Sequence, residues 1–293
     1  MPPPVLDANG TAVPVSLISL LSQTDRRDLL RDRGIPKSWV DGHFHAVDMR
    51  GTPLEDARSL INAEQYQANC GHLPGSTAIG CSLSHRNVAQ KLAQSSDDLM
   101  LVLEDDLVPA TPDVLSHLEN IAARLHPFAA AGGSFVAHLG IDDAYTFTTT
   151  RRRVVSRSNR PQSTGPQLFQ CLDVPPWQYL AHAYFISKAA AEQMTVLNTP
   201  LTVMCDWWHQ RQKLGHFDHF FYCDPILFTQ DPTLDSSLQQ DRLIFEAAGG
   251  GNKQADHPPR HRRTLSQRVI ASAAFRARML PQQMKRTVPF IIP

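Results

Sequence analysis

Three adjacent carboxylates, Glu104 to Asp106, stand at the end of the apolar run Leu99–Leu103. Such a run is typical of a buried strand in a parallel sheet, and parallel sheets bind their ligands beyond the carboxyl ends of the strands. Neighbouring anions repel one another, and a cation relieves that repulsion. A divalent metal ion, bound by oxygen atoms and shared with a phosphate substrate, would serve. The alternative is a solvated acidic turn without a ligand.

Two histidine pairs have spacings that metal ligands also use: His43 with His45, and His216 with His219. Such spacings arise often by chance in a chain with 13 histidines, so both pairs are weak candidates. The sequence lacks the phosphate-binding motif G-x-x-x-x-G-K-[ST], the dinucleotide-binding motif G-x-G-x-x-G and the hydrolase motif G-x-S-x-G. We therefore do not expect a P-loop protein, a dinucleotide-binding protein or a serine hydrolase of that type.

Strand and helix patterns alternate along the chain, which predicts an α/β domain with a mostly parallel central sheet. The segments expected as strands are Val15–Leu20, Phe44–Asp48, Leu99–Leu103, Ser134–Ile141, His182–Ile186 and Phe217–Tyr222. The segments expected as helices are Asp25–Arg33, Ser76–Gln94, one that begins at Thr111-Pro112-Asp113, one that Ser187 caps and that runs to Asn198, and a short one opened by Asp206. Residues 151–167 hold five arginines and no acid, and we expect a polar insertion there.

The composition is ordinary for a globular protein, because 42% of the 293 residues are hydrophobic and 19% are charged. No apolar run approaches the roughly 18 residues of a membrane span. The proline-rich start has neither the basic nor the apolar part of a secretory signal. The five cysteines form no C-x-x-C pair, which favours reduced thiols in a cytoplasmic protein over disulfides or a zinc knuckle.

The net charge of zero hides an uneven distribution. Residues 253–293 hold nine Lys or Arg against the single acid Asp256, so residues 1–252 carry the excess of acids. We therefore expect a domain over residues 1–252 and a basic C-terminal tail over residues 253–293. Apolar residues are interspersed in the tail, which favours contact with an anionic membrane surface. A solvated tail, a tail folded back on the acidic body, and nucleic-acid binding are the alternatives.

Four blocks occur in a characteristic order: Val15–Leu20 followed by Asp25-Arg26-Arg27; Ile79–His85; Leu101–Asp106; and Ala183–Ala190 followed by Asp206. Together they resemble glycosyltransferase family 25, which includes lipooligosaccharide and collagen galactosyltransferases. The G-C-x-x-S-H block and the E-D-D block are the most specific parts of the resemblance. Two positions depart from the family pattern. His45 stands where an acid is expected, and His182 stands where small residues are usual.

The resemblance implies a GT-A type, Rossmann-like fold for residues 1–252. It also implies the inverting transfer of a sugar, most often galactose from UDP-galactose, onto a glycan or glycolipid such as a lipooligosaccharide core. The family's metal, Mn²⁺ or Mg²⁺, is expected at Asp106 and Glu104. The nucleotide-sugar donor is expected near Ser19, Arg27, Ser84, His85, Glu104 and Asp105. For His85, a buried histidine bonded within the core is the alternative.

Inversion needs a base that takes the proton of the attacking hydroxyl group. The resemblance implies Asp206 for this role, with Asp142 and Asp143 as rivals, whereas helix capping would be a structural role for Asp206. The tryptophans Trp207 and Trp208 could stack on a sugar ring, although core packing is the more common role.

Two other functions stay open from the sequence. One is a metal-dependent nucleotidyl- or phosphotransferase, which also uses clustered acids. The other is an inactive nucleotide-sugar-binding protein, and the argument for it is that His45 replaces an expected acid. For a transferase that extends a lipid-linked glycan, the basic tail suggests a peripheral position on the cytoplasmic face of the inner membrane. We expect no nucleic-acid partner.

Overall fold

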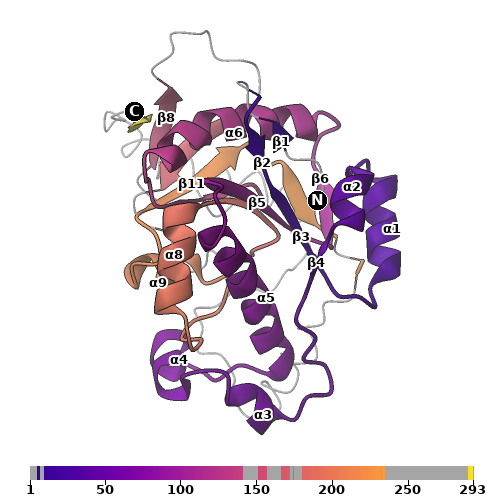
Figure 1. The fold of residues 1–293 in the computed structure, drawn as a ribbon, viewed down its shortest axis with the longest axis vertical. Helices are drawn as coiled ribbons and strands as arrows, with labels where there is room; N and C mark the ends of the chain where they lie inside the picture. The colour runs from indigo at the N-terminus through magenta and orange to yellow at the C-terminus, as the bar shows by residue number, and fades with distance from the viewer. Residues whose placement is uncertain are drawn as a thin grey trace, which may run out of the picture.

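The computed structural model describes residues 5–6, 10–140, 151–156, 166–171, 174, 180–231, 233–234 and 290–292. A large sheet lies between helices (Figure 1). Among the described residues its strand order is β13-β8-β9-β11-β7-β10-β5-β3-β4. These strands are β3 (Val15–Ser19), β4 (Phe44–His45), β5 (Leu99–Glu104), β7 (Phe135–His138), β8 (Arg151–Ser156), β9 (Gln167–Cys171), β10 (Ala183–Ser187), β11 (His219–Asp224) and β13 (Phe290–Ile292).

Helices and two small strand pairs complete the described fold. The helices are α1 (Thr24–Asp32), α2 (Lys37–Asp41), α3 (Leu54–Arg58), α4 (Ala63–Cys70), α5 (Ser76–Ala93), α6 (Val114–Ala130), α8 (Lys188–Leu197) and α9 (Trp208–Lys213). The small pairs join β1 (Val5–Leu6) to β2 (Ala12–Val13), and β6 (Leu107–Pro109) to β12 (Phe228–Gln230).

The α/β class expected from the sequence is confirmed. The expected parallel pairing occurs where β3 lies between β4 and β5, and again between β7 and β11. Strand β10 runs antiparallel to both of its neighbours, β5 and β7, so the sheet is mixed. The sequence did not indicate this direction, because an apolar strand that is buried on both faces has the same pattern in either orientation.

Packing on both faces explains the unbroken apolar run of β5. On one face, Leu101 belongs to a core cluster with Leu118 and Leu125 of α6. On the other face, Val102 belongs to a cluster with Val88 of α5 and with Met194 of α8, and these two helices lie side by side (Figure 1). The sheet therefore holds β5 firmly, and its acidic end emerges from a rigid layer.

The strand register brings three strand ends together. Ile18 of β3 lies opposite Glu104 of β5, and Leu103 lies opposite Ala183 at the start of β10. The Glu104 N–H donates to the carbonyl of His182 over 2.8 Å. Because β10 is antiparallel to β5, its first residues lie beside the last residues of β5, and β3 ends on the other side of β5. The acids therefore lie where three strands end or begin.

The structure tests several of the predicted helix starts and segments. Helix α6 begins at Val114 with Asp113 as its N-cap, so the predicted start at Thr111 is wrong: residues 111–113 form a turn before the helix. The prediction that Ser187 caps α8 is confirmed, because its side chain accepts a hydrogen bond from the N–H of Ala190. Residues 151–156 were expected in a polar insertion, yet they form β8 and pair with β9. Hydrogen bonding along the sheet outweighs the polar pattern there.

Most of the basic tail, residues 253–289, lies outside the described residues. Phe290–Ile292 form β13, which pairs in parallel with β8. None of the helices described here has the length and the apolar character that crossing a membrane requires.

Candidate active site

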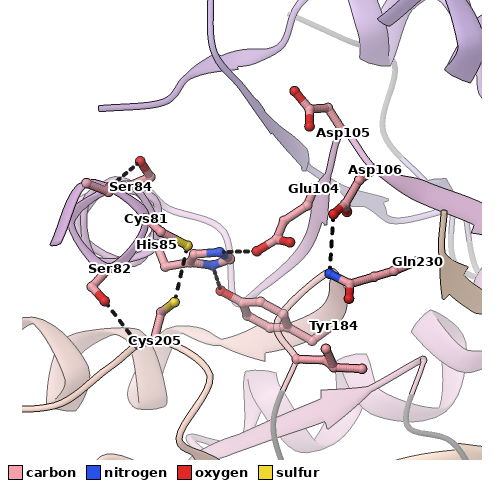
Figure 2. A network of polar contacts seen from close by, with 12 residues as sticks. Cys81, Ser82, Ser84, His85, Glu104, Asp105, Asp106, Tyr184, Cys205 and Gln230 are labelled. Atoms are coloured by element: carbon pink, nitrogen blue, oxygen red, sulfur yellow. Dashed lines mark hydrogen bonds and ion pairs between the residues drawn. The ribbon is translucent and has the colours of Figure 1, made fainter. Parts of the chain in front are cut away.

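The three acids at the end of β5 point in different directions (Figure 2). Glu104 bonds to His85 of α5, Asp105 bonds to Ser19 and Arg26, and Asp106 bonds to Gln230. Glu104 is the last residue of β5, whereas Asp105 and Asp106 form the turn between β5 and β6, and this turn sends their side chains to different neighbours. The acids therefore serve two different environments.

Asp105 lies in a set of satisfied polar groups. Its Oδ2 accepts from the Ser19 hydroxyl at 2.7 Å, and its Oδ1 pairs with Arg26 Nη1 at 3.0 Å. Arg27 Nη1 donates to the Ser19 hydroxyl at 3.0 Å and to the carbonyl of Leu20 at 2.6 Å. Ser19 and Arg27, both predicted to bind the nucleotide-sugar donor, are buried. Their contacts with Asp105 and with the main chain hold the turn between β3 and α1. Nothing in the sequence pattern indicated a separate role for Arg26.

Asp106 lies in an unsatisfied environment. Its Oδ2 accepts from Gln230 Nε2 at 3.3 Å, while its buried Oδ1 has no hydrogen-bond partner. Burial, together with the charges of Glu104 and Asp105, raises the pKa of Asp106 to about 7. Strand β12 supplies Gln230 and was not expected from the sequence. A buried carboxylate oxygen without a partner, beside other carboxylates, is suited to a hard divalent cation.

A chain of hydrogen bonds links β5, α5 and β10. Glu104 Oε1 lies 2.8 Å from Nε2 of His85, and Nδ1 of His85 lies 2.8 Å from the hydroxyl oxygen of Tyr184. His85 and Tyr184 are both buried. Burial lowers the pKa of His85, while burial and the charges of Asp105 and Asp206 raise the pKa of Glu104 to about 8. The predicted site residue His85 is thus a partner of a predicted metal ligand, Glu104.

Asp206 is half-buried beside this chain of hydrogen bonds. Helix α9 has Trp207 at its N-cap position and no side-chain capping bond, so Asp206 does not cap the helix through its carboxylate. Its Oδ1 is buried without a partner, and the N–H of Leu180 bonds to the carboxylate. Burial raises the pKa of Asp206. Since the charge of Asp206 also raises the pKa of Glu104, the two acids share one region.

The tryptophans differ in their surroundings. Trp208 is buried and meets the Tyr184 ring edge-on with ring centres 5.2 Å apart. Core packing is therefore the role of Trp208. Trp207 is half-buried, with its ring 5.8 Å from that of His72. Only Trp207 of this pair retains a surface on which a sugar ring could stack.

Ser84, predicted beside the donor, makes backbone contacts instead. Its hydroxyl donates to the Gly80 carbonyl at 2.8 Å and accepts from the Val47 N–H at 2.8 Å. Gly80 explains part of the G-C-x-x-S-H block, because a Cβ on it would lie 2.7 Å from the Val47 carbonyl oxygen. This turn of α5 therefore holds the chain that follows β4.

Two sulfur atoms lie beside His85. Cys81 Sγ and Cys205 Sγ are 3.5 Å apart, and one ligand atom each of Cys81, Cys205 and His85 fall within 4.8 Å of one another. The backbone N–H of Cys205 donates to the Ser82 hydroxyl at 3.3 Å, which fixes the loop before Asp206 against α5.

The two histidine pairs predicted as possible metal ligands do not come together at one site. His43 bonds to the carbonyl of Val40 at 3.0 Å, and its ring lies 5.0 Å from that of His45. His216 is buried beside Arg211, whereas His219 bonds to Gln170 at 2.8 Å. Neither predicted pair belongs to the cysteine–histidine cluster found among the described residues.

His182, the second departure from the family pattern, is buried in the sheet beside Gly140. Burial lowers the pKa of His182 to about 4, so its ring is neutral at pH 7. A Cβ on Gly140 would lie 1.9 Å from Nε2 of His182, so the ring occupies the space that this glycine leaves. The rival bases Asp142 and Asp143 lie outside the described residues.

One comparison with known proteins identifies a family. The sequence model of glycosyltransferase family 25, described as an LPS biosynthesis protein, matches residues 13–208. No curated protein matches the chain. The matched range holds all four blocks named above, and the mixed sheet flanked by helices is compatible with a Rossmann-like glycosyltransferase fold.

Proposed function

The chain belongs to glycosyltransferase family 25, and from that premise we propose that it transfers galactose from UDP-galactose, with inversion, onto a glycan acceptor. The family itself implies a glycosyltransferase of lipopolysaccharide biosynthesis, with a donor and an acceptor substrate. The donor sugar, the stereochemistry and the acceptor, a lipooligosaccharide core, are our proposal.

The unsatisfied side of the E-D-D strand end carries this proposal. Asp106 Oδ1 and Asp206 Oδ1 are buried, and each lacks a hydrogen-bond partner. A sugar transfer needs both kinds of group: one that holds a cation near the diphosphate, and one that accepts a proton. Two carboxylates that each have one buried oxygen without a partner are suited to these two tasks.

Asp106 is the residue that we propose to hold Mn²⁺ or Mg²⁺. Its carboxylate has an oxygen without a hydrogen-bond partner, and hard divalent cations prefer such oxygen ligands. When bound, such an ion neutralises the charge that develops on the leaving diphosphate. Glu104 is the expected second ligand, and it bonds to His85 at 2.8 Å. The charge of Glu104 contributes to the raised pKa of Asp106, so the two carboxylates lie close to each other.

Asp206 is the proposed base. It takes the proton of the acceptor hydroxyl group as that oxygen attacks the anomeric carbon. Its raised pKa makes it a stronger base than an exposed aspartate. The N–H of Leu180 orients the carboxylate, and Oδ1 remains available for the proton. Asp143 stays an alternative base in this proposal.

The donor is proposed to lie over the satisfied side, at the end of β3. This side is formed by Ser19, Arg27 and Asp105. The half-buried guanidinium group of Arg26 adds a positive charge to it. A guanidinium group beside a carboxylate can bind both the phosphate and the ribose parts of a nucleotide. His85 contributes by holding Glu104 in place.

Donor hydrolysis tests the proposal directly. The full chain is mixed with UDP-galactose, UDP-glucose, UDP-N-acetylglucosamine and GDP sugars, with Mn²⁺ or with EDTA, in the presence of a lipooligosaccharide core acceptor. We expect UDP release from UDP-galactose, abolished by EDTA and lowered about 10²–10³-fold in Asp106→Asn. Asp113→Asn is the matched control, because Asp113 is exposed and its side chain makes no capping bond.

Three results would contradict parts of this proposal. Release from another donor alone would overturn the choice of galactose. Transfer of a nucleoside monophosphate or of a phosphoryl group would instead favour the nucleotidyl- or phosphotransferase alternative. Donor binding in calorimetry without any turnover would favour the inactive binding protein.

The membrane position is a separate proposal, based on charge. Residues 253–293 hold nine basic residues and one acid, which suits an anionic lipid surface on the cytoplasmic side, where the lipid-linked acceptor would lie. Co-sedimentation with anionic vesicles should be strong for the full chain and weak for a chain that ends at Gly251. Equal binding by both would refute a role for the tail.

A further inference from the structure

Cys81, His85 and Cys205 form a cluster outside the acidic strand end, on the far side of Glu104. Cys81 and His85 lie on α5, and Cys205 lies in the loop before α9 (Figure 2). Their ligand atoms all fall within 4.8 Å of one another. Residues four apart on a helix share one face, so Cys81 and His85 present their ligand atoms to the same space.

The distance between the sulfur atoms distinguishes two kinds of chemistry. A disulfide bond needs the sulfurs about 2.05 Å apart. Two thiolates on one tetrahedral zinc ion, each at about 2.3 Å, lie about 3.8 Å apart. The observed separation of 3.5 Å is much closer to the second value. The pair is therefore placed as two ligands of one cation would be.

His85 is oriented as metal-bound histidines are. In such sites the ring nitrogen that does not hold the metal usually donates to a carboxylate, which fixes the ring and its tautomer. Glu104 Oε1 lies 2.8 Å from Nε2 of His85 and supplies this carboxylate. The other nitrogen, Nδ1, faces the neutral hydroxyl group of Tyr184 at 2.8 Å. A cation on Nδ1 would replace that contact with Tyr184 and leave the bond to Glu104 intact.

The surroundings also hold the third ligand in place. The N–H of Cys205 donates to the Ser82 hydroxyl at 3.3 Å, so the loop is anchored to the same turn of α5. Cys205 and Ser82 are buried. Asp206 follows Cys205, and its buried Oδ1 has no partner. A cation at the cluster would also stabilise the negative charge of this carboxylate.

We propose that Cys81, His85 and Cys205 bind one zinc-class divalent cation, separate from the cation at Asp106. Thiolate and imidazole ligands select such a soft metal, whereas Asp106 offers only oxygen. Binding releases the protons of the two thiols to solvent. The ion links α5 to the loop that carries Asp206, and so fixes that carboxylate relative to His85. This proposal does not depend on the identity of the transferred sugar.

The test uses the full chain, kept reduced, stripped with EDTA and then loaded with Zn²⁺ before dialysis. Elemental analysis should find one zinc ion per chain. Loading with Co²⁺ should give the charge-transfer absorption of a thiolate-bound tetrahedral cobalt ion. Cys81→Ala and Cys205→Ala should each weaken zinc binding at least about tenfold. Cys223→Ala should not, because this buried cysteine lies on β11 and its thiol contacts the carbonyl of Leu139.

Controls separate this site from folding and from the acidic site. Circular dichroism shows whether each cysteine variant folds, and zinc should raise the unfolding temperature of the parent and of Cys223→Ala but not that of Cys81→Ala or Cys205→Ala. Asp106→Asn should keep the zinc and lose the Mn²⁺-dependent turnover, so the two proposals fail independently. The zinc proposal is overturned if the parent retains no zinc, if Cys223→Ala loses zinc equally, or if mass spectrometry finds a Cys81–Cys205 disulfide in the purified chain.

Discussion

The two sides of the β5 end differ in how completely their polar atoms are paired. On the β3 side, Asp105 has Ser19 on one oxygen and Arg26 on the other. Away from β3, Asp106, which bonds to Gln230 of β12, and Asp206, which lies near Glu104, each leave one buried oxygen without a partner. Polar groups whose hydrogen bonds are all satisfied have a structural role, whereas buried polar atoms without a partner are available to bind a ligand or a proton. The comparison therefore separates the residues that build the site from those that we expect to react.

The largest expected effect is on the unpaired side. Asp206→Asn keeps the size of the side chain but removes the proton acceptor, so the rate of sugar transfer should fall about 10²–10⁴-fold. The KM for the donor should change little, because donor binding is assigned to the other side. Steady-state kinetics with donor and acceptor measure both constants. Wild-type kcat in this variant would move the base to Asp143.

The second effect is a pH dependence of stability that arises at Glu104. Folding raises the pKa of this acid from its ordinary value near 4.5 to about 8. A raised pKa means that the folded chain holds the proton more tightly, so the contribution of Glu104 is complete below pH 4.5 and is lost as the pH rises through 8. The slope is at most about 1.4 kcal/mol per pH unit.

Urea unfolding from pH 5 to pH 8, without divalent cations, measures this slope. The free energy of unfolding of the parent should fall relative to that of Glu104→Gln as the pH rises. His85 acts in the opposite direction, because burial lowers its pKa, but it is present in both proteins and largely cancels in the difference. A parent that gains stability over the variant with rising pH would contradict the assignment.

The third effect tests the paired side. Ser19→Ala removes a buried hydroxyl that accepts from Arg27 and donates to Asp105. The free energy of unfolding should fall by about 1–3 kcal/mol, since two polar partners lose a bond. Ser116→Ala, at an exposed position of α6, is the control and should be near neutral. If Ser19→Ala leaves stability unchanged but raises the KM of the donor, Ser19 binds the donor directly.

The smallest effect is expected at Ser84. Ser84→Ala removes the acceptor of the Val47 N–H and should lower the free energy of unfolding by about 0.5–1.5 kcal/mol. Turnover should stay within about twofold, because the hydroxyl contacts only backbone groups of Gly80 and Val47. A large loss of turnover at unchanged stability would restore Ser84 to the donor site.

Local patterns predicted much of this fold. The strand at Leu99–Glu104, the helix over Ser76–Ala93 and the cap at Ser187 follow from apolar runs and capping residues, which act within a few residues. The direction of β10 and the existence of β12 could not be predicted in this way. Both depend on partners that are distant along the chain, and pairing energy rather than local pattern decides them.

The site shows the same limit. The acids were found because three of them adjoin in sequence, but their different partners were not. Gln230 reaches Asp106 across 124 positions, and Cys205 reaches Cys81 across 124 positions. No spacing rule for metal or hydrogen-bond ligands spans such separations. The cysteine spacing therefore predicted only reduced thiols, whereas the structure brings the sulfurs of Cys81 and Cys205 within 3.5 Å of each other.

Leu180 shows how a backbone position can matter more than its side chain. Its φ is 80°, in the left-handed region that glycine favours. Its carbonyl accepts from His138 Nε2 and from Trp208 Nε1, both at 2.7 Å, and its N–H bonds to Asp206. None of these contacts uses the leucine side chain, which is 36% exposed. Substitutions at this position therefore act through the main chain that holds Asp206: glycine suits its positive φ, whereas a β-branched side chain would strain it.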